Sequence, residues 1–135
     1  MKVIDIQENL NAIISMVDHA EKFVVIVSPF SDLTGWEKLK TAINNAAERG
    51  VEVRYYVRKG EGYNGIEGLK VILNEVPGLH AKMFYSEKEA LISSGNLDSR
   101  PDINWVCRLD KHEEIEELLK FFKNHIEPAA QRYGA

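Results

Sequence analysis

A continuous apolar segment, followed by an amphipathic helix and an alternating segment, constrains the fold of this chain most. Phe23–Val27 reads F-V-V-I-V, which is typical of a strand that is covered on both faces. Trp36–Arg49 carries an apolar stripe at helical spacing and ends before Gly50, and Val51–Val57 then alternates as a strand does. A strand, a helix and a second strand in this order predict a parallel βαβ crossover. We therefore predict an α/β fold, a mixed and mostly parallel β-sheet sandwiched between helices.

The rest of the chain continues this mixture of strands and helices. Periodicity predicts an edge strand at Lys2–Ile6, a strand at Ile103–Leu109, and helices at Glu8–Ala20, Ile66–Leu73 and Lys111–Arg132. No linker or shift in composition divides the sequence, and a length of 135 residues suits one domain. We therefore expect a single domain that spans residues 1–135.

The composition limits the classes of function. Cys107 is the only cysteine, which rules out an internal disulfide and fits a reducing, cytoplasmic compartment. No apolar run approaches the ~20 residues of a membrane span, and the N-terminus lacks the apolar core of a signal peptide, so no membrane association is expected. The formal net charge of −4 argues against a broadly basic surface but leaves room for a local positive pocket.

A hairpin is predicted within the stretch Leu79–Leu97. Two short apolar runs, Ala81–Tyr85 and Ala90–Ile92, flank a charged break at Ser86–Glu89. Strand, turn and strand in this order indicate an antiparallel pair. Because successive side chains of a strand point to opposite faces, the register of this pair decides which polar groups meet.

Four polar side chains of this hairpin are expected to converge. Antiparallel pairing around a three-residue loop, Glu87–Glu89, would place His80 opposite Asn96 and Lys82 opposite Ser94. An imidazole can attack phosphorus or transfer a proton near neutral pH. An ammonium group and an amide N–H can hold the oxygens of a phosphoryl group as charge develops on them. The set contains no carboxylate cluster, so neither a metal nor a cofactor is predicted.

The motifs in this stretch resemble those of the phospholipase D-like superfamily. H-A-K, a short apolar strand and I-S-S-G-N-L are similar to the family signature of His-x-Lys, four residues, an Asp, and then Gly-Ser-x-Asn. Phe23–Phe30 resembles the strand-to-loop entry of the family, and Leu39–Val57 resembles its helix–glycine–strand unit. Asn104-Trp105 resembles the start of its downstream Asn-x-Glu. The resemblance implies a phospholipase D-like half-unit.

The resemblance also implies a mechanism and a partner. In the family, two His-x-Lys motifs meet across a pseudo-two-fold axis; one His forms a phosphohistidine and the other protonates the leaving oxygen. This chain has one such motif, so the resemblance implies a homodimer in which each chain contributes His80. By position, Lys82 and Asn96 match the phosphate-binding Lys and Asn, and Ser94 matches the Ser of Gly-Ser. The implied activity is that of a metal-independent phosphodiesterase, with DNA or RNA as the expected substrate.

Three cations are predicted to bind that substrate. Arg58 and Lys59 begin a glycine-rich loop that ends at Gly65, and Arg100 lies in the polar loop after Asn96. A solvated turn is the simpler interpretation of the glycine-rich loop. The functional interpretation is a lip that contacts the phosphates or bases of a nucleic acid.

Three departures from the family pattern leave alternatives open. Glu87 stands where the family has Asp, Ser93 where it has the first Gly of Gly-Ser, and Val106 where it has the Glu of Asn-x-Glu. That Glu orients the His in the family, and Glu87, Glu89 or Asp110 could replace it here. Val106 favours a second function, a catalytically weak or inactive module that binds nucleic acid or phosphate. A third function, a phospholipid-modifying enzyme, is disfavoured because the chain lacks an interfacial apolar segment.

Overall fold

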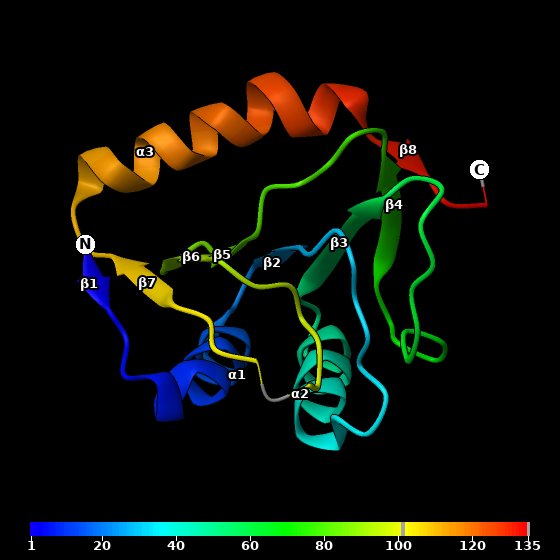
Figure 1. Cartoon of the computed structure of the whole chain (residues 1–135), viewed down its shortest axis with the longest axis horizontal. Coiled ribbons are helices and arrows are strands. Elements are labelled where there is room, and N and C mark those ends of the chain that lie inside the picture. Colours follow the sequence, from blue (N-terminus) through cyan, green and yellow to red (C-terminus); the bar gives the residue numbers. More distant parts are fainter. Residues whose placement is uncertain (101, 135) are drawn as a thin grey trace.

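The chain folds around one mixed eight-stranded β-sheet with the order β1-β7-β6-β5-β2-β3-β4-β8 (Figure 1). The computed structural model describes residues 1–100 and 102–134. The strands are β1 (Lys2–Val3), β2 (Phe23–Val27), β3 (Glu52–Arg58), β4 (Ile72–Val76), β5 (Met83–Ser86), β6 (Ala90–Ser93), β7 (Val106–Leu109) and β8 (Gln131–Arg132).

Helices cover both faces of this sheet, as the sequence predicts. Helices α1 (Asn9–His19) and α2 (Glu37–Glu48) lie on one face, and α3 (His112–Phe121) crosses the other (Figure 1). Short helical turns complete the set: η1 (Ile6–Glu8), η2 (Phe122–Ile126) and η3 (Glu127–Ala129). No helix within the described residues is both long and apolar enough to cross a membrane.

The central strand β2 is buried on both faces because each face packs against its own apolar core. Val24 and Ile26 belong to the core under α1 and α2, whereas Val25 and Val27 belong to the core under α3. All of these side chains are fully buried. The predicted bounds of this strand, Phe23–Val27, are confirmed.

The predicted βαβ crossover is confirmed, but the prediction of a mostly parallel sheet is wrong. β2 pairs parallel with β3, from Phe23↔Glu52 to Val27↔Tyr56, and β3 pairs parallel with β4. The other pairings between the named strands are antiparallel. β5 ends at Ser86 and β6 begins at Ala90, so their connection is far too short for the crossover that a parallel neighbour requires.

Two predicted helices differ from the structure. The segment Ile66–Leu73 is not a helix, because Gly65 and Gly68 adopt positive φ angles of 74° and 82° and β4 begins at Ile72. The helix predicted over Lys111–Arg132 divides into α3, η2 and η3, and its last residues form β8. Short apolar runs such as V-I-L fit a strand as well as a helix, so periodicity alone could not decide.

Strand directions bring every residue predicted for the site to one edge of the sheet. The carboxyl ends of β2, β3 and β6 lie at this edge, together with the amino ends of β5 and β7. Three segments therefore carry the predicted site residues: His80 and Lys82 before β5, Ser94, Asn96 and Arg100 after β6, and Arg58 and Lys59 at the end of β3. We refer to this edge as the site edge.

Candidate functional site

The register of the β5–β6 hairpin differs by one residue from the prediction. Tyr85 pairs with Ala90, and the Ser86 N–H donates a hydrogen bond to the Glu89 carbonyl over 2.9 Å. Glu87 and Lys88 therefore form the connection, and the predicted three-residue loop is wrong. The Ser86 hydroxyl oxygen accepts the Lys88 N–H at 3.0 Å, which closes the tighter turn.

The shifted register changes which residues lie side by side. The Ser93 N–H donates to the Lys82 carbonyl over 3.3 Å, so the backbone of Lys82 lies beside Ser93 rather than Ser94. His80 and Lys82 remain neighbours, with 3.4 Å between the imidazole Nε2 and Lys82 Nζ. His80 is exposed and Lys82 is half-buried, so both side chains are accessible to a ligand at the site edge.

The Asn96 carboxamide is held in a fixed orientation. Its Oδ1 accepts the backbone N–H of Phe30 over 3.0 Å. No residue in the described part of the chain accepts a hydrogen bond from its Nδ2, which is left to donate to a ligand. The structure thus anchors one end of this side chain and presents an N–H donor at the other.

Ser94 fixes the loop rather than presenting a free hydroxyl. Its Oγ accepts the Trp105 N–H over 2.9 Å and donates to Asn104 Oδ1 over 3.2 Å. The adjacent Gly95 is required by the same contact, because a Cβ at this position would lie 2.3–2.6 Å from the Asn104 side chain. Ser94 is therefore a positioning residue, and its hydroxyl is bonded to Asn104 and Trp105 instead of to the His80 imidazole.

A buried polar network that lies beneath the site edge was not predicted from the sequence. The Ser28 Oγ accepts the Leu97 N–H at 2.8 Å. The Tyr55 hydroxyl donates to Ser31 Oγ at 2.7 Å, and Ser31 in turn donates to the Ser28 carbonyl at 2.8 Å. Burial raises the pKa of Tyr55 far above its ordinary value, against the opposing effect of the hydrogen bonds to Ser31 and Ser28, so the hydroxyl stays a donor. The only sequence signal was a Ser-Pro pair after a buried strand.

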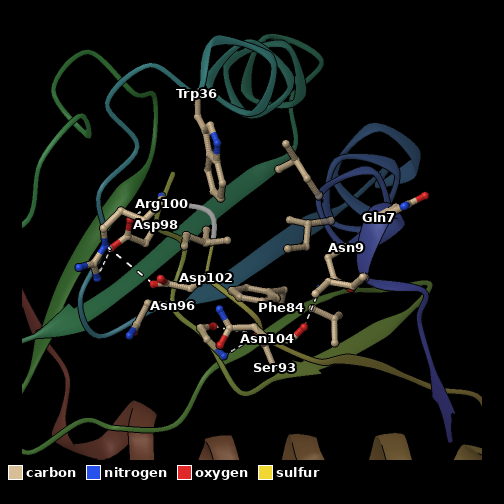
Figure 2. Close-up of a pocket in the computed structure, with 16 residues that line it drawn as sticks. Gln7, Asn9, Trp36, Phe84, Ser93, Asn96, Asp98, Arg100, Asp102 and Asn104 are labelled. Carbon is tan, nitrogen blue, oxygen red and sulfur yellow. Dashed lines mark hydrogen bonds and ion pairs between the residues drawn. The ribbon is translucent and has the colours of Figure 1, made fainter.

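The three predicted substrate-binding cations lie in different surroundings. The Arg58 guanidinium stacks over the Phe30 ring, 5.8 Å from its centroid, close to the residue that anchors Asn96. Lys59 Nζ donates to the side chain of Gln131. Arg100 pairs with Asp98 and approaches Asp102 (Figure 2). Arg58 thus contacts the residue whose backbone N–H anchors Asn96. The charge of Arg100, in contrast, is offset by the carboxylates of Asp98 and Asp102.

Glu87 binds backbone at the end of the sheet opposite the site edge. Its carboxylate accepts the N–H groups of Glu21, Lys22 and Phe23 over 2.9, 3.0 and 3.1 Å. Burial acts to raise the pKa of Glu87, but these N–H donors outweigh it and lower the pKa to about 2. This carboxylate therefore fixes the hairpin turn to the start of β2.

Glu87, Glu89 and Asp110, the carboxylates that could have replaced the family's orienting Glu, do not contact His80. Glu89 pairs with Arg108 at 3.6 Å, and Asp110 pairs with the N-terminal ammonium. All three carboxylates lie at the far ends of their strands, and the four residues of β5 alone span roughly 13 Å. Within the described residues, Lys82 is the only hydrogen-bonding partner of the His80 ring.

The comparisons with known proteins bear on the fold. No protein-family model and no curated protein matches the chain. The structure is similar to that of a phospholipase D family member, Nuc from Salmonella typhimurium, with a TM-score of 0.71, 14% identity and coverage of 99% of this chain and 96% of Nuc. It is also similar to NucT from Helicobacter pylori, with a TM-score of 0.76, 15% identity and coverage of 98% of both chains.

A third similar structure is that of TrmBL2, an archaeal chromatin protein with a novel mode of DNA binding. The TM-score is 0.64 at 15% identity, over 96% of this chain and 53% of TrmBL2, so this chain spans about half of that protein. At such low identities the similarity shows the fold. The chain has the phospholipase D-like fold, as its motifs predict.

Proposed function

We propose that this protein is a phosphodiester hydrolase that works through His80 and acts on nucleic acid as a homodimer. The observation that carries the proposal is that the His80–Lys82 pair directly precedes β5 and the anchored Asn96 follows the neighbouring strand β6, so both come from the same edge of a phospholipase D-like sheet. An imidazole flanked by an ammonium group and a carboxamide N–H suits attack on a phosphodiester, because both donors stabilise charge on the phosphoryl oxygens.

The proposed reaction has two displacements. A lone pair of one His80 ring attacks phosphorus, and the P–O bond to the leaving oxygen breaks as that oxygen takes a proton from the second His80. Water then attacks the phosphohistidine, the P–N bond breaks, and a proton of the water passes to the second His80. Lys82 Nζ and Asn96 Nδ2 donate to the phosphate oxygens in both steps. We expect both steps to proceed in EDTA.

An apolar surface next to the site edge supports the homodimer. Ile103 is 90% exposed and Trp105 is 50% exposed. The Trp105 N–H is bonded to Ser94, so this surface adjoins the site. Large apolar side chains exposed together are typical of a surface that another protein covers. A second copy placed across a two-fold axis would cover them and bring its own His80 to the site.

The activity test compares the wild-type protein with His80→Ala in EDTA. Bis(p-nitrophenyl) phosphate, single- and double-stranded DNA and RNA are the substrates. We expect hydrolysis to be lost in His80→Ala while the circular dichroism spectrum stays the same. His112→Ala is the matched control, because His112 is exposed on α3 and its Nε2 lies 2.9 Å from a Glu116 carboxylate oxygen. A fully active His80→Ala variant would end the proposal.

The homodimer is tested by mixing wild-type protein with His80→Ala and measuring the activity after their subunits have exchanged. If each site needs two copies of His80, an equal mixture retains roughly a quarter of the wild-type activity, because only dimers of two wild-type chains are active. Independent monomeric sites would instead leave about half. Analytical ultracentrifugation of the same samples reports the oligomeric state, and an active monomer would contradict the homodimer.

A second candidate function is binding of nucleic acid or phosphate without efficient catalysis. Val106, at the position of the family's orienting Glu, is an apolar residue buried to 3% exposure in the core. His80 also lacks a carboxylate hydrogen bond in the described part of the chain. DNA binding without cleavage, equal in wild type and His80→Ala, would select this function. Turnover of phosphatidylcholine alone would instead select the phospholipid-modifying function.

A further inference from the structure

The turn that follows β2 fixes which end of the Asn96 side chain faces a ligand. A carboxamide carries an acceptor oxygen and a donor nitrogen, and a half-turn about its last bond exchanges the two. The Phe30 N–H, 3.0 Å from Asn96 Oδ1, selects the arrangement in which the oxygen binds backbone. Phe30 belongs to residues 28–31, which we call the β2 turn. The direction of one backbone N–H therefore decides whether Asn96 offers a phosphate a donor or an acceptor.

Two buried hydroxyl groups close the β2 turn. Ser31 Oγ donates to the Ser28 carbonyl over 2.8 Å, which joins the last residue of the turn to its first. The Tyr55 hydroxyl, on the neighbouring strand β3, donates to Ser31 Oγ over 2.7 Å. Because the Ser31 oxygen accepts from Tyr55, its own proton is directed to the Ser28 carbonyl. The Tyr55 hydroxyl thus fixes the side chain that closes the turn.

The β2 turn also holds the backbone that carries Asn96. The Leu97 N–H donates to Ser28 Oγ over 2.8 Å, and the Asp32 N–H donates to the Leu97 carbonyl over 2.8 Å. Both bonds are made by the residue that follows Asn96 in sequence. The side chain of Asn96 and its backbone are therefore both attached to the turn, and a change in the turn reaches the carboxamide directly.

Without the Tyr55 hydroxyl, the β2 turn would lose its fixed side chain. Tyr55 is fully buried in the core under α1 and α2, and Ser31 is 3% exposed, so solvent offers no ready replacement for the lost donor. A serine held by one partner instead of two has other rotamers available. When Ser31 leaves the Ser28 carbonyl, the turn opens and the Phe30 N–H is no longer directed at Asn96.

We propose that Tyr55 is a positioning residue, which acts through Ser31 and Phe30 to keep Asn96 Nδ2 directed at a bound phosphate. The inference rests on the proposed function and adds to it a residue that touches no substrate. With the turn open, the carboxamide can present its oxygen instead, and that oxygen repels the charge on the phosphoryl group. Because this charge grows toward the transition state, the rate falls more than the affinity for substrate.

The first test measures hydrolysis of bis(p-nitrophenyl) phosphate in EDTA by Tyr55→Phe, which loses one oxygen atom and keeps the ring. We expect kcat to fall by about tenfold, the size of effect seen when a group that orients a metal ligand is removed, and KM to change by less than about twofold. Tyr56→Phe is the matched control and should keep the wild-type kcat. Tyr56 is the next residue of β3 and is also buried, but it lies in the core under α3.

The second test asks whether Tyr55 acts through Asn96. The carboxamide is absent in Asn96→Ala, so adding Tyr55→Phe to that variant should cause no further fall in kcat. A general loosening of the structure would instead lower kcat by the same factor in both backgrounds. Ser31→Ala removes the same hydrogen bond from its other partner, should behave as Tyr55→Phe does, and replaces it if that variant does not fold.

The third test needs no turnover and follows the side-chain amide of Asn96 by ¹H–¹⁵N NMR. Inorganic phosphate should shift this signal in the wild-type protein and in Tyr56→Phe. The shift should be several-fold smaller in Tyr55→Phe, because the carboxamide nitrogen is no longer held toward the phosphate.

Three results would overturn the role of Tyr55: a phosphate response of Asn96 that is absent in the wild type or equal in Tyr55→Phe, a loss of kcat that Tyr56→Phe shares, or a loss that persists in Asn96→Ala. Hydrolysis that depends on His80 but is unchanged in Tyr55→Phe overturns the positioning and leaves the hydrolase intact. A phosphate response that depends on Tyr55, in a protein that hydrolyses no diester, leaves the positioning intact and overturns the hydrolase.

Discussion

Replacing Glu87 with Ala should destabilise the protein more than any other change of an acidic side chain on the hairpin. The Glu87 carboxylate accepts three backbone N–H groups at the start of β2, over 2.9–3.1 Å. Hydrogen bonds to a charged group contribute roughly 1.5–3 kcal/mol each. Glu87 is partly accessible to solvent, so we discount each bond to about 1 kcal/mol. The expected loss is about 3 kcal/mol, or a fall of roughly 10 °C in Tm.

The effect should also depend on pH, with a sign that follows from the pKa. Because the folded-state pKa of Glu87 is lowered from 4.5 to about 2, its contribution is complete above about pH 5 and is lost as the pH falls toward 2. Urea unfolding followed by circular dichroism at pH 7 and pH 3 measures this. The difference in unfolding free energy between wild type and Glu87→Ala should shrink by about half or more at pH 3.

Glu89→Ala is the matched control for this prediction. Glu89 lies in the same turn region and forms a single ion pair, 3.6 Å from Arg108. Exposed pairs of this kind contribute roughly 0–1 kcal/mol. If Glu87→Ala is no more destabilising than Glu89→Ala, or if its effect is the same at both pH values, the role assigned to the Glu87 carboxylate is incorrect.

Two further substitutions test the loop that carries Asn96. Gly95→Ala should destabilise by about 2 kcal/mol, because its Cβ would overlap the Asn104 side chain, whereas Gly62→Ala, with no atom within 4 Å of the new Cβ, is the control with little effect; thermal unfolding measures both. Ser28→Ala should cost about 1–3 kcal/mol, because the Leu97 N–H loses its buried acceptor, and a change below this range in urea unfolding would contradict the network.

Much of the fold could be predicted from local patterns. The bounds of β2 are those predicted. The ends of α1, α2 and β3 differ by one residue from the predicted ends, and β7 ends as predicted but begins three residues later. These elements carry a clear period of two or 3.6 residues, or a continuous apolar run bounded by turn residues. Ile66–Leu73 is too short for its apolar pattern to distinguish a helix from a strand, and pairing with β3 accounts for the strand β4 that begins at Ile72.

The site was predicted only in part. The sequence indicated which segments carry the candidate side chains, and the topology places those segments at one edge of the sheet. It could not place Ser94, whose hydroxyl is bonded to Asn104 and Trp105, or Arg100, whose charge is offset by Asp98. The partners of Ser94 and Arg100 lie at most 11 residues away along the chain. Other hydrogen-bonding and acidic residues lie equally close, so the sequence does not show which of them is the partner.

The sequence by itself determined the α/β class, the β2–α2–β3 crossover and the His-x-Lys motif, because periodicity and motif spacing are local properties of the chain. Only the tertiary structure decided the register of the β5–β6 hairpin, the use of Glu87 to hold β2, and the anchoring of Asn96 by Phe30. The Glu87 and Asn96 contacts depend on backbone N–H groups that lie more than sixty residues away along the chain. Such contacts form only when several strands are assembled, so no local pattern encodes them.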